Sequence, residues 1–349
     1  MTEAGTILVV GLARTTLAAE EAKALAAGER GGVVLFRRNV TDGVERVAEL
    51  TAAVRAAAGA DALVAIDQEG GRVVRIREPA LALPPMRRIG DLDDATFAER
   101  LATAQARELA ALGITMSFAP VVDVHTHPDN PIIGDRAFAG TPEKVAVFAK
   151  AWARGLAAGG VLSCAKHFPG HGDTTVDSHL ALPRVERHRA GLDAIEIAAF
   201  RGVVSEVDSM MSAHVVYPAL DEKMATLSST ICTDLLRRDL GFEGVLFSDD
   251  LEMKAIALPA GEAAVLAVTA GCDSVLVCSR ADLAAEVYEA LVREAEKSAA
   301  FRARLGEAAA RMKKMRARHA CTAVAPSDLP AAFASSKAIA DELASRVPA

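Results

Sequence analysis

The stretch GVLFSDDLEM, residues 244–253, decides the fold. Its apolar first half is typical of a β-strand, and it passes directly into Ser248, Asp249 and Asp250. Strands that are apolar along most of their length suit a parallel sheet that is covered on both faces. Polar residues at the carboxyl end of such a strand are where the catalytic groups of a (β/α)8 barrel lie. The stretch therefore predicts a barrel with Asp249 at its mouth, the alternative being that these residues cap the next helix.

Seven other segments share this apolar character, and stretches with apolar residues at helical spacing separate most of them. The predicted strands are 6–12, 32–36, 62–67, 116–124, 162–167, 209–213, 244–249 and 274–278. The predicted helices between them are 44–58, 94–112, 142–158, 192–204, 229–240 and 261–270. Eight strands with intervening helices in about 280 residues predict an α/β fold, a single (β/α)8 TIM-type barrel. A doubly wound open sheet would use the same elements and is the alternative.

The C-terminal part of the chain is helical and charged, with predicted helices at 281–297, 301–317 and 330–344. We expect these extra C-terminal helices to pack on the outside of the barrel. No linker or low-complexity segment interrupts the chain. Residues 1–349 are therefore expected to form one catalytic domain, with the barrel at about 5–280 and the C-terminal helices at about 281–349.

The composition argues against several classes of protein. The net charge is −7 with acidic and basic residues well mixed, so no basic block marks a nucleic-acid or anionic-lipid partner. The apolar runs are far shorter than a membrane span, and the N-terminus does not resemble a secretory signal. The five cysteines are odd in number and widely spread. We therefore expect a cytoplasmic protein with reduced thiols and without nucleic-acid or membrane partners. We also expect a monomer or a weak homodimer, although the composition does not determine the oligomeric state.

Reactive side chains fall at or just after the carboxyl ends of the predicted strands. They are Asp67, Asp123, Lys166, His167, His214, Asp249 and Asp250. In a parallel barrel these strand ends meet at one face, where catalytic groups lie. Buried Asp or Lys elsewhere in such strands would be costly unless paired. These positions therefore predict an active site at the barrel mouth.

The segment KHFPGHGDTTVDSH, residues 166–179, allows three kinds of chemistry. The ligands of a metal site would be His167, His171, Asp173, Asp177 and His179, although no HExxH or HxxEH pattern is present. A Schiff base would use Lys166, which ends a strand but lacks the expected apolar surroundings. Proton transfer would use Asp177 to orient His179 as general acid/base, since residues two apart project to the same side of an extended chain. We favour proton transfer, the simplest alternative being a solvated polar loop.

Two loops at the predicted mouth hold arginines beside carboxylates: DQEGGRVVR at 67–75 and NPIIGDRAF at 130–138. Such pairs bind sugar hydroxyls, carboxylates or phosphates. The alternative is a surface ion pair that only ties down a loop. Neither GxxxxGKS nor GxGxxG is present, so nucleotide binding has no support.

Several stretches together resemble one family. They are DQEGGRV (67–73), FAPVVDV (118–124), NPIIGDRAF (130–138), KHFPGHGDTTVDSH (166–179), MSAHVVYP (211–218) and GFEGVLFSDDLEM (241–253). In this order they resemble the glycoside hydrolase family 3 β-N-acetylglucosaminidases of the single-domain bacterial NagZ type. The resemblance spans almost the whole barrel but not the C-terminal helices. It implies a TIM barrel and a retaining mechanism through a covalent glycosyl-enzyme, without a cofactor or a metal.

The resemblance also implies roles for individual residues. Asp249 corresponds to the nucleophile, and His179 paired with Asp177 corresponds to the general acid/base. The positions that correspond to sugar-binding residues are Asp67, Arg75, Arg136, Lys166 and His167. The implied carbohydrate substrate carries a terminal β-linked N-acetylglucosamine (GlcNAc). In cell-wall recycling this is GlcNAc joined to 1,6-anhydro-N-acetylmuramic acid, with or without a peptide.

Other functions stay open. A neutral imidazole does not repel an anion as a carboxylate would, so a glycoside phosphorylase with the same site is one alternative. Substrate-assisted catalysis by the acetamido group is another, which a carboxylate at the position of Asp249 argues against. A metal-dependent amidohydrolase-like barrel and an inactive, sugar-binding barrel are the remaining alternatives.

Overall fold

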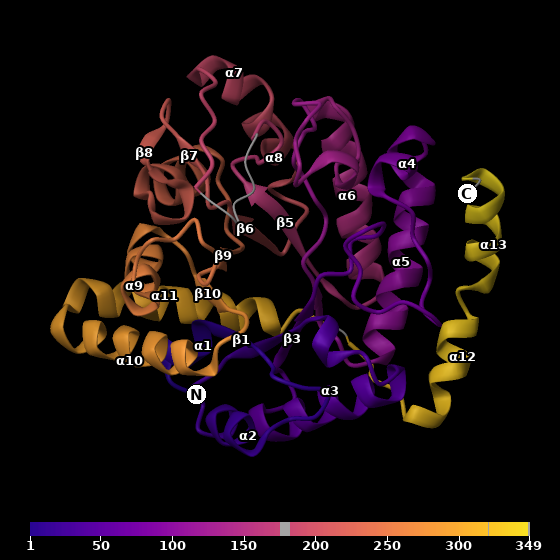
Figure 1. Ribbon diagram of the computed structural model, residues 1–349, viewed down its shortest axis with the longest axis horizontal. Coiled ribbons are helices and arrows are strands. Elements are labelled where there is room, and N and C mark those ends of the chain that lie inside the picture. Colours follow the sequence, from indigo (N-terminus) through magenta and orange to yellow (C-terminus); the bar gives the residue numbers. More distant parts are fainter. Residues whose placement is uncertain (175–181, 320, 348–349) are drawn as a thin grey trace.

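The structure is a computed structural model that describes residues 1–174, 182–319 and 321–347. Eight parallel strands close into a barrel in the order β1–β10–β9–β6–β5–β4–β3–β2 (Figure 1). They are β1 (Leu8–Gly11), β2 (Gly32–Leu35), β3 (Leu63–Ile66), β4 (Met116–Ser117), β5 (Leu162–Phe168), β6 (Ser209–Ser212), β9 (Val245–Asp250) and β10 (Ser274–Val277). Because β1 pairs with both β2 and β10, the sheet has no free edge. The predicted barrel is confirmed, and the open-sheet alternative is excluded.

Helices follow most of the strands and cover the outside of the barrel. The long ones are α3 (Val44–Ala58), α5 (Ala95–Ala111), α6 (Pro142–Ala158), α9 (Ala260–Ala270) and α10 (Ala281–Lys297). The shorter ones are α1 (Glu3–Ile7), α2 (Ala19–Ala26), α4 (Met86–Asp91), α7 (Arg189–Ala194) and α8 (Glu196–Val203). Their boundaries follow local chemistry: the Asp94 side chain caps α5 by accepting the Phe97 N–H at 2.9 Å, and α6 begins at Pro142.

The helices differ from the prediction at several places. Residues 3–7 form the helix α1, although the sequence predicts a strand from residue 6; α4 is not predicted; and the helix predicted over 330–344 is divided into α12 (Leu329–Ala334) and α13 (Lys337–Arg346). The sequence pattern does not predict α2, because Leu25 is its one buried residue and the apolar periodicity is weak. The helix predicted over 192–204 is interrupted at Ile195, which separates α7 from α8. The helix predicted over 229–240 is the π-helix η4 (Thr230–Asp239). None of these differences removes a strand of the barrel.

Two further differences lie near the mouth of the barrel. β4 ends at Ser117 instead of residue 124, although backbone hydrogen bonds to β5 continue past that point: the Lys166 N–H donates to the Pro120 carbonyl at 3.1 Å, and the Val122 N–H donates to the Lys166 carbonyl at 2.8 Å. Beyond it, an isolated bridge joins Val121 to Lys166 of β5. After β6, the chain forms an antiparallel hairpin of β7 (Val216–Tyr217) and β8 (Asp221–Met224), whose strands are too short to give a sequence pattern.

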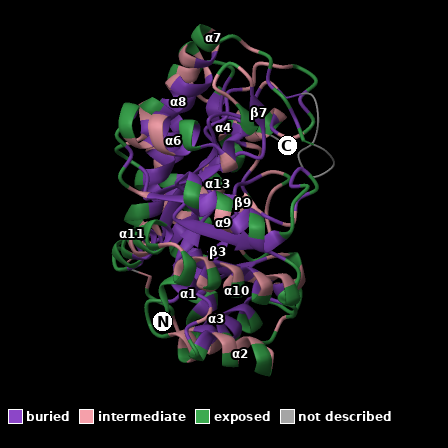
Figure 2. Ribbon diagram, turned by 90° about the vertical axis from the view of Figure 1, so that its left-hand side faces the viewer, coloured by how far each residue is buried: buried purple, intermediate pink, exposed green. Residues whose placement is uncertain are grey.

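The core consists mainly of small and aliphatic side chains, and the buried barrel lies between outer helices with exposed faces (Figure 2). β2, β3 and β10 are buried at every position, as their apolar runs predict. Gly155 and Gly159 let α6 approach α5 closely. A Cβ atom at these glycines would lie 2.6 Å from the Ala102 Cβ and 2.3 Å from the Ala106 Cβ.

The C-terminal helices pack on the outside of the barrel, as predicted. They are α11 (Ala299–Arg316), α12 (Leu329–Ala334) and α13 (Lys337–Arg346). α12 and α13 lie beside α5 (Figure 1), where Arg346 pairs with the α5 cap Asp94 at 2.9 Å. In the described part of the chain, no helix combines the length and the apolar character needed to cross a membrane.

Candidate active site

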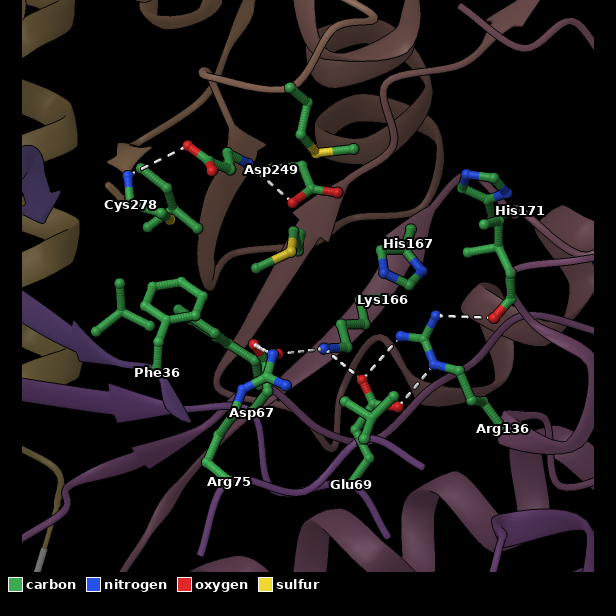
Figure 3. A pocket seen from close by; sticks show the side chains of 18 residues that line it. Phe36, Asp67, Glu69, Arg75, Arg136, Lys166, His167, His171, Asp249 and Cys278 are labelled. Carbon is green, nitrogen blue, oxygen red and sulfur yellow. Dashed lines mark hydrogen bonds and ion pairs between the residues drawn. The ribbon is translucent and has the colours of Figure 1, made fainter. Parts of the chain in front are cut away.

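The carboxyl ends of the barrel strands surround a cavity, whose lining side chains are drawn in Figure 3. Six of the predicted site residues line it: Asp67, Arg75, Arg136, Lys166, His167 and Asp249. Asp67 follows β3, Lys166 and His167 lie in β5, and Asp249 lies in β9. The other two predicted residues, Asp177 and His179, lie outside the described residues.

Glu69 is the centre of an ionic network in this cavity. Arg136 donates to both carboxylate oxygens of Glu69 at 2.8 Å. Lys166 Nζ lies 2.6 Å from Glu69 Oε1 and 2.7 Å from Asp67 Oδ1. Arg75 Nη2 donates to the other oxygen of Asp67 at 2.8 Å. The three cations and two carboxylates leave one excess positive charge.

The network also fixes the charge of its members. Burial alone would raise the pKa of Glu69, but Arg136 and Lys166 hold that pKa well below its usual range. Burial likewise opposes ionisation of Asp67, whose pKa is nevertheless lowered by Lys166 and Arg75. Burial would lower the pKa of Lys166, yet Asp67 and Glu69 raise it. Lys166 is therefore an ammonium ion, which argues against a Schiff-base role because that chemistry needs a neutral amine.

The neighbouring residues Lys166 and His167 both reach the cavity because β5 is irregular at this point. In a regular strand, successive side chains point to opposite faces. The pairing of β5 with β6 shifts between Lys166 and Phe168, so the alternation is interrupted. The irregularity brings an ammonium group and an imidazole into one cavity.

Asp123, which is fully buried, orients His167. Its carboxylate lies 2.7 Å from His167 Nδ1 and accepts the backbone N–H groups of His167 at 3.2 Å and His171 at 2.6 Å. Because a carboxylate accepts the Nδ1 proton, Nε2 is the ring nitrogen left for a ligand. Asp123 therefore fixes both the imidazole and the start of the loop after β5.

Asp249 and Asp250 have different environments although they are adjacent in β9. Burial raises the pKa of Asp249, but His214 and His167 bring it below its usual value, and the Asp250 N–H donates to its Oδ1 at 2.8 Å. Burial raises the pKa of Asp250 to about 7. The Asp250 carboxylate accepts backbone N–H groups of Glu252 at 3.1 Å and Cys278 at 3.3 Å. Asp249 is thus ionised, as Asp67 and Glu69 are, whereas the Asp250 carboxylate is held by backbone N–H groups.

The metal-site interpretation has no support in the part of the chain that the structure describes. There, no three His, Cys, Asp or Glu side chains are grouped as metal ligands. His171 Nδ1 lies 2.7 Å from Thr174 Oγ1, and burial lowers the pKa of His171 to about 4. Asp173 pairs with Arg187 at 2.7 Å. His171 and Asp173 therefore take part in local contacts of the loop after β5.

The two arginine-bearing loops contain both kinds of ion pair that the sequence allows. Arg72 and Asp135 pair at 3.1 Å with side chains that are each 47% exposed, and Arg72 also donates to the Ile132 carbonyl at 2.6 Å. This pair ties one loop to the other at the surface. Arg136 instead reaches Glu69, which is 2% exposed, inside the cavity.

Two residues of this site received no role from the sequence. Glu69 lies two positions after Asp67, and residues two apart share one side of an extended chain, so the spacing held a usable signal. Asp123 stands at a predicted strand end, but nothing in the sequence pairs it with His167, 44 residues later. The pairing of Glu69 with Arg136 and Lys166, and that of Asp123 with His167, can be read only from the closed barrel.

The chain is similar to known proteins over most of its length. A family model described as "Glycosyl hydrolase family 3 N terminal domain" matches residues 3–315. A protein named "Beta-hexosaminidase" from Neisseria meningitidis serogroup C is 42% identical over 293 residues, which cover 81% of this chain and 81% of that protein. A second protein named "Beta-hexosaminidase", from Idiomarina loihiensis, is 39% identical over 301 residues, which cover 84% of this chain and 90% of that protein.

Solved structures show the same architecture. The crystal structure of NagZ from Neisseria gonorrhoeae in complex with N-trifluoroacetyl-D-glucosamine matches with a TM-score of 0.84 and 35% identity. The match covers 99% of this chain and 98% of that chain. The similarity therefore includes every strand that contributes to the cavity.

Proposed function

The chain belongs to glycosyl hydrolase family 3 and is a glycoside hydrolase, and from this premise we propose that it is a retaining exo-β-N-acetylglucosaminidase with Asp249 as nucleophile. The observation that carries the proposal is the ionised Asp249 carboxylate at the end of β9, facing the charged network of the cavity (Figure 3). The name of the relatives, β-hexosaminidase, supports the substrate class. The acylated glucosamine held by the gonococcal protein supports it too.

We assign the recognition of the terminal sugar to the ionic network. Lys166, Arg75 and Arg136 supply donors, and Asp67 supplies an acceptor, which suits hydroxyl groups that both donate and accept. His167 adds a ring nitrogen whose direction is set by Asp123. Because the ion pairs hold these groups before a ligand arrives, little reorganisation accompanies the reaction.

In the first step, His179 donates a proton to the glycosidic oxygen while a carboxylate oxygen of Asp249 attacks the anomeric carbon. The bond from the anomeric carbon to the leaving oxygen breaks, the leaving group departs as a neutral alcohol, and a glycosyl ester forms on Asp249. The N–H of Asp250 holds one oxygen of Asp249, which leaves the other for attack. The roles of His179 and Asp177, which lie outside the described residues, rest on the family resemblance.

In the second step, neutral His179 takes a proton from water, and the water oxygen attacks the anomeric carbon. The ester bond breaks, the Asp249 carboxylate is restored, and the sugar leaves with its original β configuration. An ionised carboxylate at this strand end suits direct attack and argues against catalysis by the acetamido group alone.

Phosphorolysis is the second candidate, with phosphate in place of water. The excess positive charge of the Asp67–Glu69–Lys166–Arg75–Arg136 network favours an anionic acceptor, and a neutral imidazole does not repel one. The product would be a sugar 1-phosphate. Because both reactions share the glycosyl-enzyme, only the acceptor distinguishes them.

We propose GlcNAc joined to 1,6-anhydro-N-acetylmuramic acid, with or without a stem peptide, as the natural substrate. The resemblance of the loop segments to the NagZ type supports this substrate and a role in peptidoglycan recycling. The cytoplasmic location, the single-domain organisation and the monomer or weak homodimer remain predictions.

The test is hydrolysis of a chromogenic β-N-acetylglucosaminide beside the matching β-glucoside, with and without phosphate. We expect release from the acetamido sugar by the wild type and none by Asp249→Ala. Formation of a sugar 1-phosphate that depends on added phosphate would identify the phosphorylase. No turnover of either sugar by the folded wild type would contradict the proposal.

A further inference from the structure

Behind Asp249 lies a line of buried hydrogen bonds that begins on β6 and the segment after it. Ser212 Oγ lies 2.9 Å from Thr226 Oγ1, which lies 2.7 Å from His214 Nδ1. His214 Nε2 lies 3.1 Å from the backbone oxygen of Asp250. Ser212, His214 and Thr226 are all fully buried. These contacts connect residues at the end of one barrel strand to the next strand of the barrel, β9.

The backbone of Asp250 passes this connection on to the nucleophile. Its N–H donates to Asp249 Oδ1 at 2.8 Å, and its carbonyl oxygen faces His214. The Asp250 side chain is separately held by the N–H groups of Glu252 and Cys278. The position of the Asp249 carboxylate therefore depends on how firmly the backbone of residue 250 is held.

The partners of His214 determine where its protons lie. A carbonyl oxygen can only accept, so Nε2 must carry a hydrogen. In neutral His214, Nδ1 then accepts the hydroxyl hydrogen of Thr226. In charged His214, Nδ1 donates to Thr226, whose hydroxyl hydrogen turns to the Ala213 carbonyl at 3.1 Å. Thr226 can thus satisfy both charge states without moving.

We propose that His214 is a positioning residue for the nucleophile: it fixes Asp249 through the backbone of Asp250. The inference rests on the proposed function, in which Asp249 attacks the anomeric carbon. The sequence places His214 at a strand end, but the histidine takes no part in the ionic network or in the proposed chemical steps. The inference gives it a role.

The charges around Asp249 agree with this role. Lys166 and His167 face it from β5, His214 faces it from the end of β6, and Asp250 adjoins it on β9. Against the effect of burial, His214 lowers the pKa of Asp249 most, ahead of His167 and Lys166. Removing the charge of His214 should therefore raise the pKa of the nucleophile.

Two substitutions separate the hydrogen bond from the charge. His214→Phe removes both, and His214→Gln keeps an N–H donor of similar reach without the charge. Thr226→Val removes the hydroxyl at nearly constant volume, and Thr226→Ser restores it. The readout is kcat/KM against pH for an aryl β-N-acetylglucosaminide with an activated leaving group, so that protonation of the leaving group does not limit the rate.

We expect His214→Phe to lower kcat/KM by about ten- to a hundredfold, the scale of leaving a buried carbonyl oxygen without its hydrogen bond. The acid limb of the kcat/KM–pH profile of His214→Phe should move to higher pH, because the nucleophile must be ionised to react. His214→Gln should recover much of the rate but keep the shifted limb. Thr226→Val should lower the rate and Thr226→Ser should recover it.

Ser274→Ala is the matched control, since Ser274 is a fully buried β10 residue that donates to the Ile7 carbonyl at 2.8 Å, away from Asp249. It should destabilise the barrel and leave the acid limb in place. A wild-type kcat/KM with an unmoved acid limb in folded His214→Phe would overturn the proposal, as would equal changes of both in Ser274→Ala. If His214→Phe does not fold, His214→Gln and Thr226→Val decide the outcome.

Asp249→Ala separates this inference from the proposed function. If Asp249→Ala is inactive while His214→Phe keeps the wild-type kcat/KM and pH profile, the positioning role alone fails. If Asp249→Ala retains the wild-type rate, Asp249 is not the nucleophile, and both the proposed function and this inference fail.

Discussion

Both ends of the barrel bury carboxylates among cationic side chains, but the two clusters are built differently. At the base, Asp273 directly precedes β10 and is fully buried. It accepts hydrogen bonds from Arg237, Arg304 and Arg311 and from the backbone N–H of Leu246. The arginines come from η4 and α11, so this cluster joins two helices to the start of two strands.

At the mouth, Asp67 and Glu69 are held by Arg75, Arg136 and Lys166, but these side chains also line a cavity. Asp67 and Arg75 keep 16% and 24% of their side-chain surface exposed. At the base the three arginines thus surround a carboxylate that is fully buried, whereas at the mouth Asp67 and its partners line a cavity. What distinguishes them is their position relative to the carboxyl ends of the strands, where a barrel leaves room for a ligand.

The largest expected effect is on stability, at the base. Asp273→Asn removes the charge that three arginines share, so we expect the free energy of unfolding to fall by about 3–5 kcal/mol. The kcat/KM of the folded fraction should not change, because the cluster does not face the cavity. Urea unfolding at pH 7, with activity corrected for the folded fraction, measures both. A folded variant with normal stability but poor turnover would contradict the comparison.

The matched substitution at the mouth, Glu69→Gln, should instead lower activity strongly and stability only slightly. Glu69→Gln keeps the shape but leaves Arg136 and Lys166 with one carboxylate fewer, so both donors lose their preset positions. We expect kcat/KM to fall by about a hundredfold, or ~3 kcal/mol. The free energy of unfolding should fall by only about 1–2 kcal/mol, since water in the cavity can solvate the two cations. If Glu69→Gln costs stability as Asp273→Asn does and retains activity, the mouth network is structural too.

The mouth network should also make the protein sensitive to acid. The pKa of Glu69 is lower in the folded protein than its ordinary value of about 4.5, so the network stabilises the fold above that pH and less so below it. Between pH 7 and pH 3, the free energy of unfolding of the wild type should fall by about 2 kcal/mol more than that of Glu69→Gln. Urea unfolding of both proteins at pH 7 and pH 3 gives this value. A difference between them that does not change with pH would show that Glu69 is not held ionised.

The fold was largely predictable because a parallel barrel buries its strands on both faces. Apolar runs such as 32–36 and 274–278 therefore mark strands without ambiguity. Elements with little buried surface gave no such signal: α2 buries Leu25 alone, and β8 is half exposed. Past Ser117 the predicted β4 continues as separate hydrogen bonds to β5 and an isolated bridge at Val121, which an apolar run does not distinguish from a regular strand.

The candidate site was predictable in its members but not in its contacts. Asp67, Lys166 and Asp249 could be found because polar residues at the ends of apolar strands are conspicuous. That Arg136 pairs with Glu69, 67 residues away in the sequence, depends on the closure of the barrel. An arginine beside a carboxylate is equally compatible with Arg72 and Asp135, which pair on the surface. Only the three-dimensional arrangement separates these two cases.

The smallest expected effect is at the surface pair Arg72–Asp135, and it tests where the binding site at the mouth ends. Arg72 and Asp135 are both 47% exposed, so Arg72→Ala should change the free energy of unfolding by less than about 1 kcal/mol. The kcat/KM should stay within about twofold of the wild type, since Arg72 contacts loop carbonyls and does not line the cavity. Arg75→Ala is the matched comparison, three residues later on the same loop but paired with Asp67 in the cavity, and it should lose at least about tenfold. If the aryl glycoside assay showed equal losses for both, the binding surface would extend beyond the cavity to the loop that Arg72 ties down, and exposure would no longer mark the limit of the site.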